Sequence, residues 1–479
     1  MAITRIILWL GNSCVLCAVL LAVTALSAFF MLDFSSAGKV AAIALTSGVM
    51  GATLIATTYN TPSQERNADA LLFLLIFWCF IPLIGAMPYM MLGATDDYIS
   101  AYFEAVSAFT TTGASALIAD DLPQTLLLWR SILQWFGGVS VATFAVVILA
   151  ALNLAGTGIH RSALFTLKTG DLFTRLIGIG RIVLGIYGLL AGLCFVTMVI
   201  TGTDAFTAIC LSLTALSTGG LAPETGPLAG YVGRVSALIL GIFCVIGAMN
   251  ISVIWDLLRL RRLRNIMSMF KNVEHRGLIV MAALLSLFGL FYVGFNHAFT
   301  LVVESLYFVS TAGFDYNVIG IEMLPPVILI AIALMGGSAL STAGGVKIIR
   351  MLLLFRHLST DMSRLSHPSR IVPVSFKSQH IPDRAFLSIW MYFFGYTLFF
   401  GVSILAIGAT GLSFEDAVAT GAASLSNMGP LLPATLPESG LTYVDFTALQ
   451  KGVSAIFMLI GRVEVLAVLI LFTPSFWVR

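Results

Sequence analysis

Thr110-Thr-Thr-Gly-Ala114 is the stretch that decides the fold, because three later segments repeat its pattern. The repeats are Ser217-Thr-Gly-Gly-Leu221, Ser310-Thr-Ala-Gly-Phe314 and Ser426-Asn-Met-Gly-Pro430. Each has a small polar residue three positions before a glycine, and the successive glycines are 107, 93 and 116 residues apart. This spacing indicates a small two-helix unit rather than a short solenoid repeat.

The similarity extends upstream of the four glycines. Asp97, Asp204, His297 and Ser413 each lie 16 residues before one of them, and a mostly apolar run follows each. Asp and Ser favour the N-cap of a helix, and His297 follows Asn296, another residue that caps well. A run of ten to twelve residues makes a helix of roughly 16 Å. Such a helix is too short to cross a bilayer, which needs about 20 residues.

Each unit therefore predicts a capped half-length helix that leads into a glycine-bearing loop. The negative end of the helix dipole points at that loop. Four loops that meet on one axis would offer backbone carbonyls to a dehydrated cation, as in potassium-channel filters. In a single copy, the small residues would indicate only helix packing. The predicted potassium-binding filter consists of Thr110, Thr111, Thr112, Gly113, Ser217, Thr218, Gly219, Gly220, Ser310, Thr311, Ala312, Gly313, Ser426, Asn427, Met428 and Gly429.

Composition places the chain in a membrane. Of its 479 residues, 59% are hydrophobic and only 10% are charged, whereas soluble domains carry about 25% charged residues. The six cysteines fall in apolar segments, and the Cys14–Cys17 pair has no second pair nearby, so we expect packing residues rather than a disulfide or metal site. The first apolar stretch, about 6–32, is longer than a signal-peptide core, and we expect it to be a retained helix.

The expected fold is an all-α polytopic membrane protein, with four fused units of helix, pore helix, filter and helix around one pore. We expect ten spanning helices and four half-helices. The predicted division is an N-terminal two-helix region (1–60), pore repeat 1 (61–158), pore repeat 2 (159–258), pore repeat 3 with a gate loop (259–357) and pore repeat 4 (358–479).

The distribution of charge predicts the orientation. Lys and Arg concentrate in 161–181, 259–276 and 347–384, on the side that also holds the N-terminus. Basic loops favour the cytoplasmic side, so the glycine loops are expected near the outer face. Acidic residues such as Asp120, Asp204 and Asp315 collect on that outer side, where they either raise the local cation concentration or are simply solvated loop charges.

A glycine-rich break interrupts the third repeat. Four glycines lie within the ten residues Gly336–Gly345, which predicts a broken helix. Irregular backbone at membrane depth is tolerated only inside protein or against a water-filled cavity. A movable obstruction below the filter and close packing by small residues are both consistent with this segment. The residues of the predicted gate loop are Gly336, Gly337, Ser338, Ser341, Thr342, Gly344 and Gly345.

Arg462 and Glu464 lie within the last apolar segment. A charge inside a membrane is costly and usually faces a cavity or a partner. Residues two positions apart on a helix do not face each other, so these two are not expected to pair. We expect Arg462 to line the pore below the filter, while an ion pair with another helix is the alternative, above all for Glu464.

These motifs resemble the TrkH family within the Trk/Ktr/HKT potassium transporters. The resemblance rests on the four loops, Gln134-Trp-Phe-Gly-Gly138, the Gly336–Gly345 segment with Val346-Lys-Ile-Ile-Arg350, Gly461-Arg-Val-Glu464 and Thr473-Pro-Ser-Phe-Trp477, and it covers nearly the whole chain. It implies a homodimer in the bacterial cytoplasmic (inner) membrane, with one pore per protomer. It also implies a gate at Gly336–Gly345, Arg462 in the pathway and a TrkA-type nucleotide-binding cytoplasmic regulator.

The same resemblance bears on selectivity. In sodium-selective plant relatives a serine replaces the first filter glycine, whereas Gly113 is intact here, which favours potassium. Asn427-Met-Gly-Pro430 departs most from a threonine-rich filter and indicates weaker selectivity than that of a true potassium channel.

The expected function is potassium uptake through a gated, channel-like pore. The alternatives are a secondary transporter that couples potassium to protons or sodium, since broken helices also mark those proteins, and a less selective Na⁺/K⁺ pathway. An enzyme is not expected, because no spanning segment holds a catalytic or metal-ligating set. No cofactor is expected either: Gly156-Thr-Gly-Ile-His-Arg161 lacks the third glycine and the context of a nucleotide motif. K⁺ is the transported ion.

Overall fold

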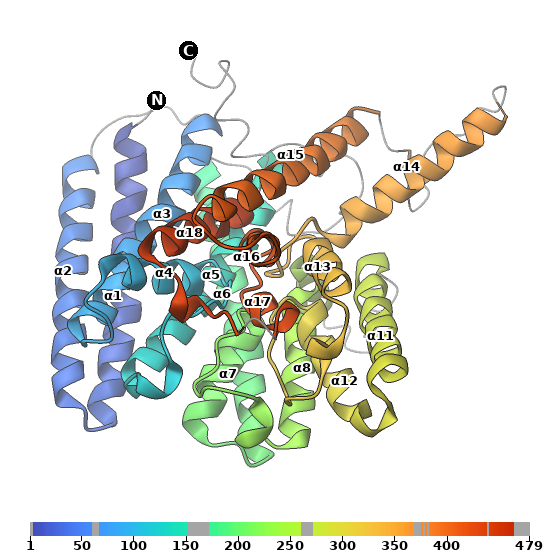
Figure 1. Cartoon of the computed structure of the whole chain (residues 1–479). Coiled ribbons are helices and arrows are strands. Elements are labelled where there is room, and N and C mark those ends of the chain that lie inside the picture. Colours follow the sequence, from blue (N-terminus) through green and yellow to red (C-terminus); the bar gives the residue numbers. More distant parts are fainter. Residues whose placement is uncertain are drawn as a thin grey trace.

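The computed structural model describes residues 3–59, 67–151, 172–259, 272–367, 375–376, 379–380, 383–437 and 440–463. The expected features at Gly156–Arg161, Glu464 and Thr473–Trp477, and most of the basic stretch at 259–271, lie outside these residues. The described chain is almost entirely helical (Figure 1). A two-residue antiparallel pair, β1 (Ser375–Phe376) with β2 (Gln379–His380), is the exception.

The N-terminal pair is formed by α1 (Ile3–Phe30) and α2 (Phe34–Thr58), which stand side by side at one edge of the molecule (Figure 1). Small residues bring the two backbones together: a Cβ on Gly51 would lie 2.7 Å from the carbonyl oxygen of Gly11. Cys14 and Cys17 are buried and free, which fits the expected packing role.

Four short helices recur at the predicted places, and each is twelve or thirteen residues long. They are α4 (Tyr98–Phe109), α7 (Ala205–Ser217), α12 (Ala298–Val309) and α16 (Phe414–Leu425). None of them reaches the length of a membrane span.

Three of the four predicted caps are confirmed. Asp97 accepts from the backbone N–H of Ile99 and Ser100, Asp204 accepts in the same way at α7, and Ser413 accepts at α16. The hydrogen bond from the Ser100 hydroxyl is the main factor that lowers the pKa of the Asp97 carboxyl, so this cap is ionised at neutral pH. The expectation for the third repeat is wrong: Asn296, the expected capping residue, lies within a 3₁₀ turn, η6 (Phe295–His297), that precedes α12, and no side-chain cap bond is made at the start of η6 or of α12.

Seven helices among the described residues are long and apolar enough to cross a membrane, and one bent pair makes an eighth. The bent pair corrects our expectation of a continuous second helix in repeat 2. There α8 (Arg234–Ala248) and α9 (Ile251–Arg259) meet at 97°. The bend is stabilised from outside the helix, because Asn250 N–H donates to Nε2 of His275 (3.1 Å) and Ile251 N–H donates to the Leu340 carbonyl (3.3 Å).

The broken helix of the third repeat is confirmed. It consists of α13 (Pro326–Met335), the irregular Gly336–Gly345 and α14 (Ile348–Ser366). In Figure 1, α14 projects from the body of the molecule. The remaining helices are α3 (Asn67–Met91), η1 (Ala119–Asp121), α5 (Gln124–Ala151), α6 (Leu172–Ile200), η4 (Leu228–Gly230), α11 (Val273–Val293), η7 (Ile321–Met323), α15 (Asp383–Gly408), α17 (Leu431–Thr435), η8 (Tyr443–Asp445) and α18 (Ala448–Val463).

Candidate ion pathway

The four predicted filter loops follow the C-termini of the four short helices, and we call them filter loops 1 to 4 in chain order. The second position of each loop has a left-handed backbone, at Thr111 (φ 52°), Thr218 (53°), Thr311 (65°) and Asn427 (51°). In the first three loops the glycine is left-handed as well, at Gly113 (φ 80°), Gly220 (78°) and Gly313 (67°). Alternating left-handed residues turn successive carbonyls away from a regular helix, as a carbonyl-lined filter requires.

The loops contact one another in a closed cycle. A Cβ on Gly113 would overlap the Gly219 carbonyl oxygen of loop 2, and one on Gly220 would overlap the Ala312 carbonyl oxygen of loop 3. A Cβ on Gly313 would lie 3.0 Å from Pro430 of loop 4, and one on Gly429 would overlap the Ala114 N–H of loop 1. The order around the axis is therefore 1, 2, 3, 4, and loops 1 and 3 lie opposite each other.

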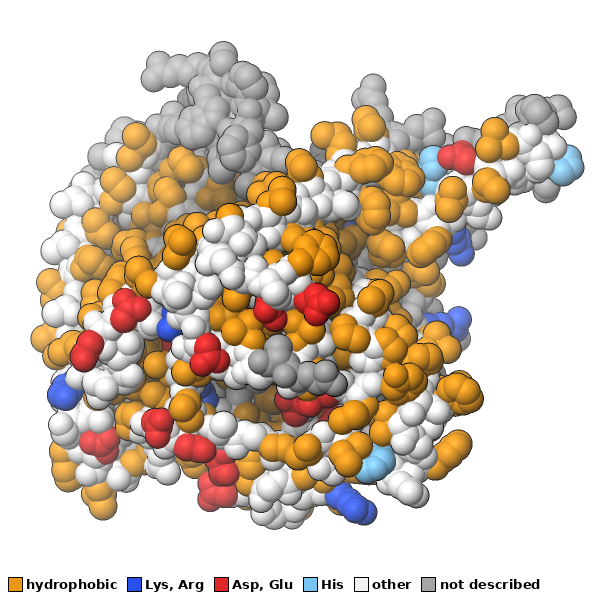
Figure 2. All heavy atoms as spheres, in the orientation of Figure 1, with side chains coloured by type: hydrophobic (Ala, Val, Ile, Leu, Met, Phe, Trp, Pro, Cys, Tyr) orange, Lys and Arg blue, Asp and Glu red, His pale blue; other side chains and the backbone are white. Residues whose placement is uncertain are grey.

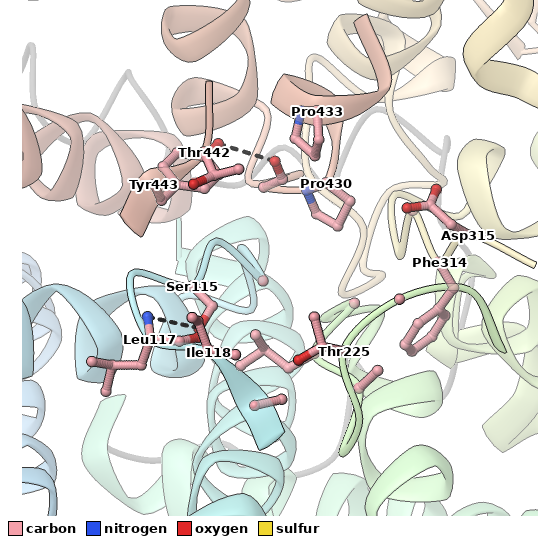
Figure 3. Close-up of a pocket in the computed structure, with 18 of the residues that line it drawn as sticks. Ser115, Leu117, Ile118, Thr225, Phe314, Asp315, Pro430, Pro433, Thr442 and Tyr443 are labelled. Atoms are coloured by element: carbon pink, nitrogen blue, oxygen red, sulfur yellow. Dashed lines mark hydrogen bonds between the residues drawn. The ribbon is translucent and has the colours of Figure 1, made fainter. Parts of the chain in front are cut away.

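A cavity of about 490 Å³ opens on one side of this ring, and all four filter glycines line it. Figure 3 shows Pro430 and Pro433 across the cavity from Ser115, Ile118 and Thr225. The cavity is the vestibule through which an ion would reach the loops, and we use the name vestibule for it below.

Acidic side chains gather around this part of the molecule, on the lower half of the face in Figure 2. Asp315, Glu224 and Asp445 line the vestibule together with one basic residue, Arg130. Arg130 is 2% exposed and donates to the Ala222 carbonyl, so it is a buried brace rather than a solvated loop charge.

Filter loop 4 differs from the other three. Its glycine, Gly429, is not left-handed, and its N–H donates to the Thr112 carbonyl of loop 1. The Asn427 side-chain amide donates to Oγ1 of Thr112 (3.1 Å) and to the Met458 carbonyl (2.8 Å). The predicted departure at Asn427-Met-Gly-Pro430 thus has a structural counterpart, because this loop is tied to its neighbour.

Two neutral side chains hold filter carbonyls from outside the ring. Gln134 in α5 donates from Nε2 to the Gly219 carbonyl (2.8 Å), and the Tyr443 hydroxyl donates to the Gly429 carbonyl (3.0 Å). Gln134 belongs to the Gln134–Gly138 motif, and nothing in the sequence pairs it with a loop 85 residues away. Contacts of this kind need the tertiary structure to be recognised.

The gate loop, Gly336–Gly345, lies directly against the filter, and every residue in it is buried. Gly344 N–H donates to Oγ1 of Thr311 in loop 3 (3.1 Å). The Thr342 hydroxyl donates to the Leu216 and Gly247 carbonyls (3.2 and 3.1 Å), both in repeat 2. A Cβ on Gly344 would overlap the Ser426 carbonyl of loop 4. The segment thus touches three of the four repeats.

Two side chains fix the gate loop on its other side. The Glu274 carboxylate, at the start of α11, accepts from Ala339 N–H (2.7 Å). Lys347 has a left-handed backbone (φ 80°), and its Nζ donates to the carbonyls of Ser341 (3.3 Å) and Ala343.

Arg462 connects the filter with the gate loop. Its guanidinium donates to the Thr110 carbonyl, to Oγ1 of Thr111 and to the Thr342 carbonyl. These partners belong to filter loop 1 and to the gate loop, so Arg462 bridges two of the predicted pathway segments. Glu464, for which an ion pair with another helix was the alternative, lies outside the described residues.

Sequence reasoning missed two buried carboxylates beside the loops. Glu104 and Glu304 are 0% and 4% exposed. A charged residue inside an otherwise apolar half-helix is the signal that would have identified them.

Four short helices that aim four loops at one vestibule, above an irregular buried segment, define a channel-like membrane protein for cations. Comparison with known proteins agrees. The family described as "TrkH: Cation transport protein" matches residues 39–478, and the chain belongs to this TrkH family.

Individual relatives match over most of their length. The chain is 33% identical to the Trk system potassium uptake protein TrkH of Escherichia coli (strain K12) over 430 residues, 86% of this chain and 87% of that protein. It is 31% identical to TrkH of Halomonas elongata over 454 residues, 91% and 92% of the two chains. The crystal structure of the potassium transporter TrkH from Vibrio parahaemolyticus superposes with a TM-score of 0.88 at 27% identity, and the match covers 100% of both chains.

Proposed function

We propose that this protein mediates potassium uptake across the cytoplasmic membrane through a gated pore with a backbone-carbonyl filter. The observation that carries the proposal is the closed cycle of four loops at the foot of one vestibule, with a buried irregular segment against their other side. The names of the relatives, which are potassium uptake proteins, support potassium as the ion.

The filter consists of the four loops predicted from the sequence. Potassium would be coordinated by loop carbonyls, which replace its hydration shell. The Thr110 carbonyl accepts a hydrogen bond from Arg462 in this structure, and the Thr112 and Gly219 carbonyls are held by Gly429 and Gln134. Potassium would therefore compete with the Arg462 guanidinium for the Thr110 carbonyl.

Gly336–Gly345 is the gate in this proposal. It fills the space against loops 3 and 4, and Arg462 ties it to loop 1. A glycine-rich segment can hold two conformations of similar energy, which a modest bias redistributes.

The bias comes from a cytoplasmic partner in this proposal. The relatives belong to a "Trk system", a name that implies several components. We expect a TrkA-type nucleotide-binding regulator that acts on α14, which continues directly from the gate loop and projects from the body (Figure 1). We also expect the protein to act as a homodimer with one pore per protomer.

Cation flux into proteoliposomes tests the proposal. Purified protein is reconstituted, and uptake of K⁺, Rb⁺, Na⁺ and Li⁺ is compared with that of empty vesicles. We expect K⁺ and Rb⁺ to exceed Na⁺ and Li⁺. Equal uptake of all four ions would contradict a selective filter, and dependence of K⁺ uptake on a proton or sodium gradient would favour the coupled transporter.

A further inference from the structure

Two of the four short helices carry a buried carboxylate at the same position. Glu104 in α4 and Glu304 in α12 each lie nine residues before the filter glycine of their repeat. The corresponding residues of the other two helices are Leu211 and Thr420, so the carboxylates occur only in repeats 1 and 3. Burial of an ionisable group is costly unless hydrogen bonds compensate for the lost water, and the two carboxylates have such bonds.

Glu304 binds the chain that leaves filter loop 3. Its Oε1 accepts from the backbone N–H of Tyr316 (3.0 Å) and Asn317 (3.1 Å), and its Oε2 accepts from Ile321 N–H (2.7 Å). Gly320 lies against the same carboxylate, where a Cβ would overlap Oε2 of Glu304. The segment from 316 to 321 therefore wraps around one side chain of its own pore helix.

Glu104 has the same relation to filter loop 1. Its Oε1 accepts from the hydroxyl of Ser115 (2.8 Å) and from the backbone N–H of Ala116 and Leu117 (3.0 Å for Leu117). Both carboxyl groups thus bind the chain segment that follows a filter glycine in the same repeat.

The two carboxylates lie behind the loops, because neither Glu104 nor Glu304 lines the vestibule. Oε1 of Glu104 and both oxygens of Glu304 face backbone N–H groups. This placement argues against direct coordination of the passing ion and for a role in positioning the carbonyls that do coordinate it.

We infer that Glu104 and Glu304 are positioning residues that set ion selectivity by clamping two opposite filter loops. The inference rests on the proposed function. Loops 1 and 3 lie across the ring from each other, so clamping both fixes one diameter of the filter. Each carboxyl accepts three hydrogen bonds from the segment that follows its loop. Loops 2 and 4 are instead held by single hydrogen bonds from Gln134 and Tyr443. The support of the filter therefore has two-fold symmetry, with loops 1 and 3 held more firmly than loops 2 and 4.

The direct test removes hydrogen-bond acceptors from each carboxylate. In Glu304→Gln, one acceptor oxygen becomes an NH₂ group that faces backbone N–H donors. Because all three donors beside loop 1 bind Oε1 of Glu104 alone, Glu104→Leu is used there to remove that acceptor. We expect the K⁺/Na⁺ permeability ratio, measured from reversal potentials in mixed salts, to fall severalfold in each variant. Total flux should change less than the ratio, because the pore is intact. The matched controls, Leu211→Met and Thr420→Val at the equivalent positions, should keep the wild-type ratio.

A second variant displaces the Glu304 carboxyl group without removing it. Gly320→Ala keeps the Glu304 carboxylate but pushes it away from the loop, and we expect the same fall in the ratio. Because this variant retains the Glu304 carboxyl group, it also serves if Glu304→Gln fails to yield folded protein. Monodispersity in detergent confirms folding before any ratio is compared.

The outcomes distinguish this inference from the proposed function. If Gly113→Ser alters the ratio whereas folded Glu104→Leu, Glu304→Gln and Gly320→Ala do not, the clamp is wrong and the filter assignment stands. If none of them alters it, including Gly113→Ser, both ideas are wrong. Equal effects of the controls and the carboxylate variants would also overturn the clamp, since they would show general sensitivity of the short helices.

Discussion

Gly113 shows why a glycine ends each filter loop. Its backbone is left-handed (φ 80°), and a Cβ there would overlap the Gly219 carbonyl oxygen of the neighbouring loop. Either property alone disfavours a side chain, and together they fix the residue type. The sequence showed the need for unusual backbone angles, but the contact between loops is visible only in the structure.

Gly113→Ser should weaken discrimination between potassium and sodium. The serine Cβ would push loop 2 away from loop 1 and disturb the carbonyls that both present. A reversal-potential measurement in mixed K⁺ and Na⁺ gives the permeability ratio, which we expect to fall. Gly93→Ala, also at a left-handed glycine (φ 77°) but with no neighbour within 4 Å, is the control for backbone strain alone. An unchanged ratio in well-folded Gly113→Ser would refute the filter assignment.

Arg462→Ala should raise cation flux through the protein. The substitution removes a positive charge from the path, and at about 4 Å with an effective dielectric near 20 such a charge opposes a cation by about 4 kcal/mol. It also frees the Thr110 carbonyl and releases the gate loop at Thr342. Initial rates of K⁺ uptake into proteoliposomes measure the effect. Arg462→Lys retains the charge but loses the divergent donors, so its flux should lie between those of the wild type and the alanine variant. Lower flux in a folded alanine variant would identify Arg462 as a structural residue.

Residue-scale prediction from the sequence succeeded where a motif was local. Asp97, Asp204 and Ser413 cap their helices because capping depends on residues two or three positions away. The cap expected at Asn296 is absent because a 3₁₀ turn includes that residue. Gln134, Arg130 and Tyr443 were not assigned roles, since their partners are set by the tertiary fold.

At the scale of elements, the gate loop depends on close approach as much as on flexibility. Gly344 lies so near loop 4 that a Cβ would overlap the Ser426 carbonyl. This contact, the Thr311 bond and the Glu274 bond all hold the same ten residues in place. The resting position is therefore specified by packing, and a small increase in side-chain volume is enough to disturb it.

Gly344→Ala should raise flux in the absence of the cytoplasmic partner, because the methyl group cannot fit while the loop is against Ser426. Partner-free proteoliposomes report the basal K⁺ rate, which we expect to increase. Gly452→Ala, on α18 with open space around its Cα, adds the same methyl group without a clash and should leave the rate unchanged. Basal flux at the wild-type level in a folded Gly344→Ala protein would place the gate elsewhere.

Shortening the gate loop gives an independent result at the same scale. Deletion of about six residues from Gly336–Gly345 should give K⁺ flux without the partner, since the chain would no longer reach across the filter. A disulfide that locks the loop against loop 4 should abolish flux until it is reduced. If the deletion variant folds, dimerises and still requires the partner, then the segment has a packing role only.

The elements show where sequence patterns stop being informative. Glycine content predicted the break in the third repeat, because four glycines in ten residues are unfavourable in a helix. The 97° bend between α8 and α9 was missed, since its residues continue an apolar pattern and the stabilising partners, His275 and Leu340, come from other elements.

At the scale of the whole molecule, the orientation in the membrane decides which side of the membrane the vestibule faces. The proposed orientation places the vestibule outside and α14 in the cytoplasm. Val318 beside loop 3 and Met362 on α14 are similarly exposed, at 66% and 62%. In intact cells, a membrane-impermeant maleimide should therefore label Val318→Cys readily and Met362→Cys only after permeabilisation. The described native cysteines other than Cys79 are buried, so unsubstituted protein gives the background. The reverse labelling pattern would invert the proposed orientation.

The architecture was accessible from the sequence because it is repeated. Four matching motifs at matching offsets predicted four half-helices and one shared axis, and the closed cycle of glycine contacts agrees with that prediction. The unequal support of the four loops was not predicted, since the sequence does not show which groups the carboxyls of Glu104 and Glu304 bind.

Because the four filter loops belong to one polypeptide, a single codon change alters one quarter of the ring and leaves the other three untouched. In a ring of identical subunits the same codon change would alter all four loops at once, and an asparagine such as Asn427 would be present in every loop. Here each loop can change independently, and the hydrogen bond between Asn427 and Thr112 joins loop 4 to loop 1 without requiring the same pair at the other junctions. Ion preference in this architecture can accordingly be adjusted in small inherited steps.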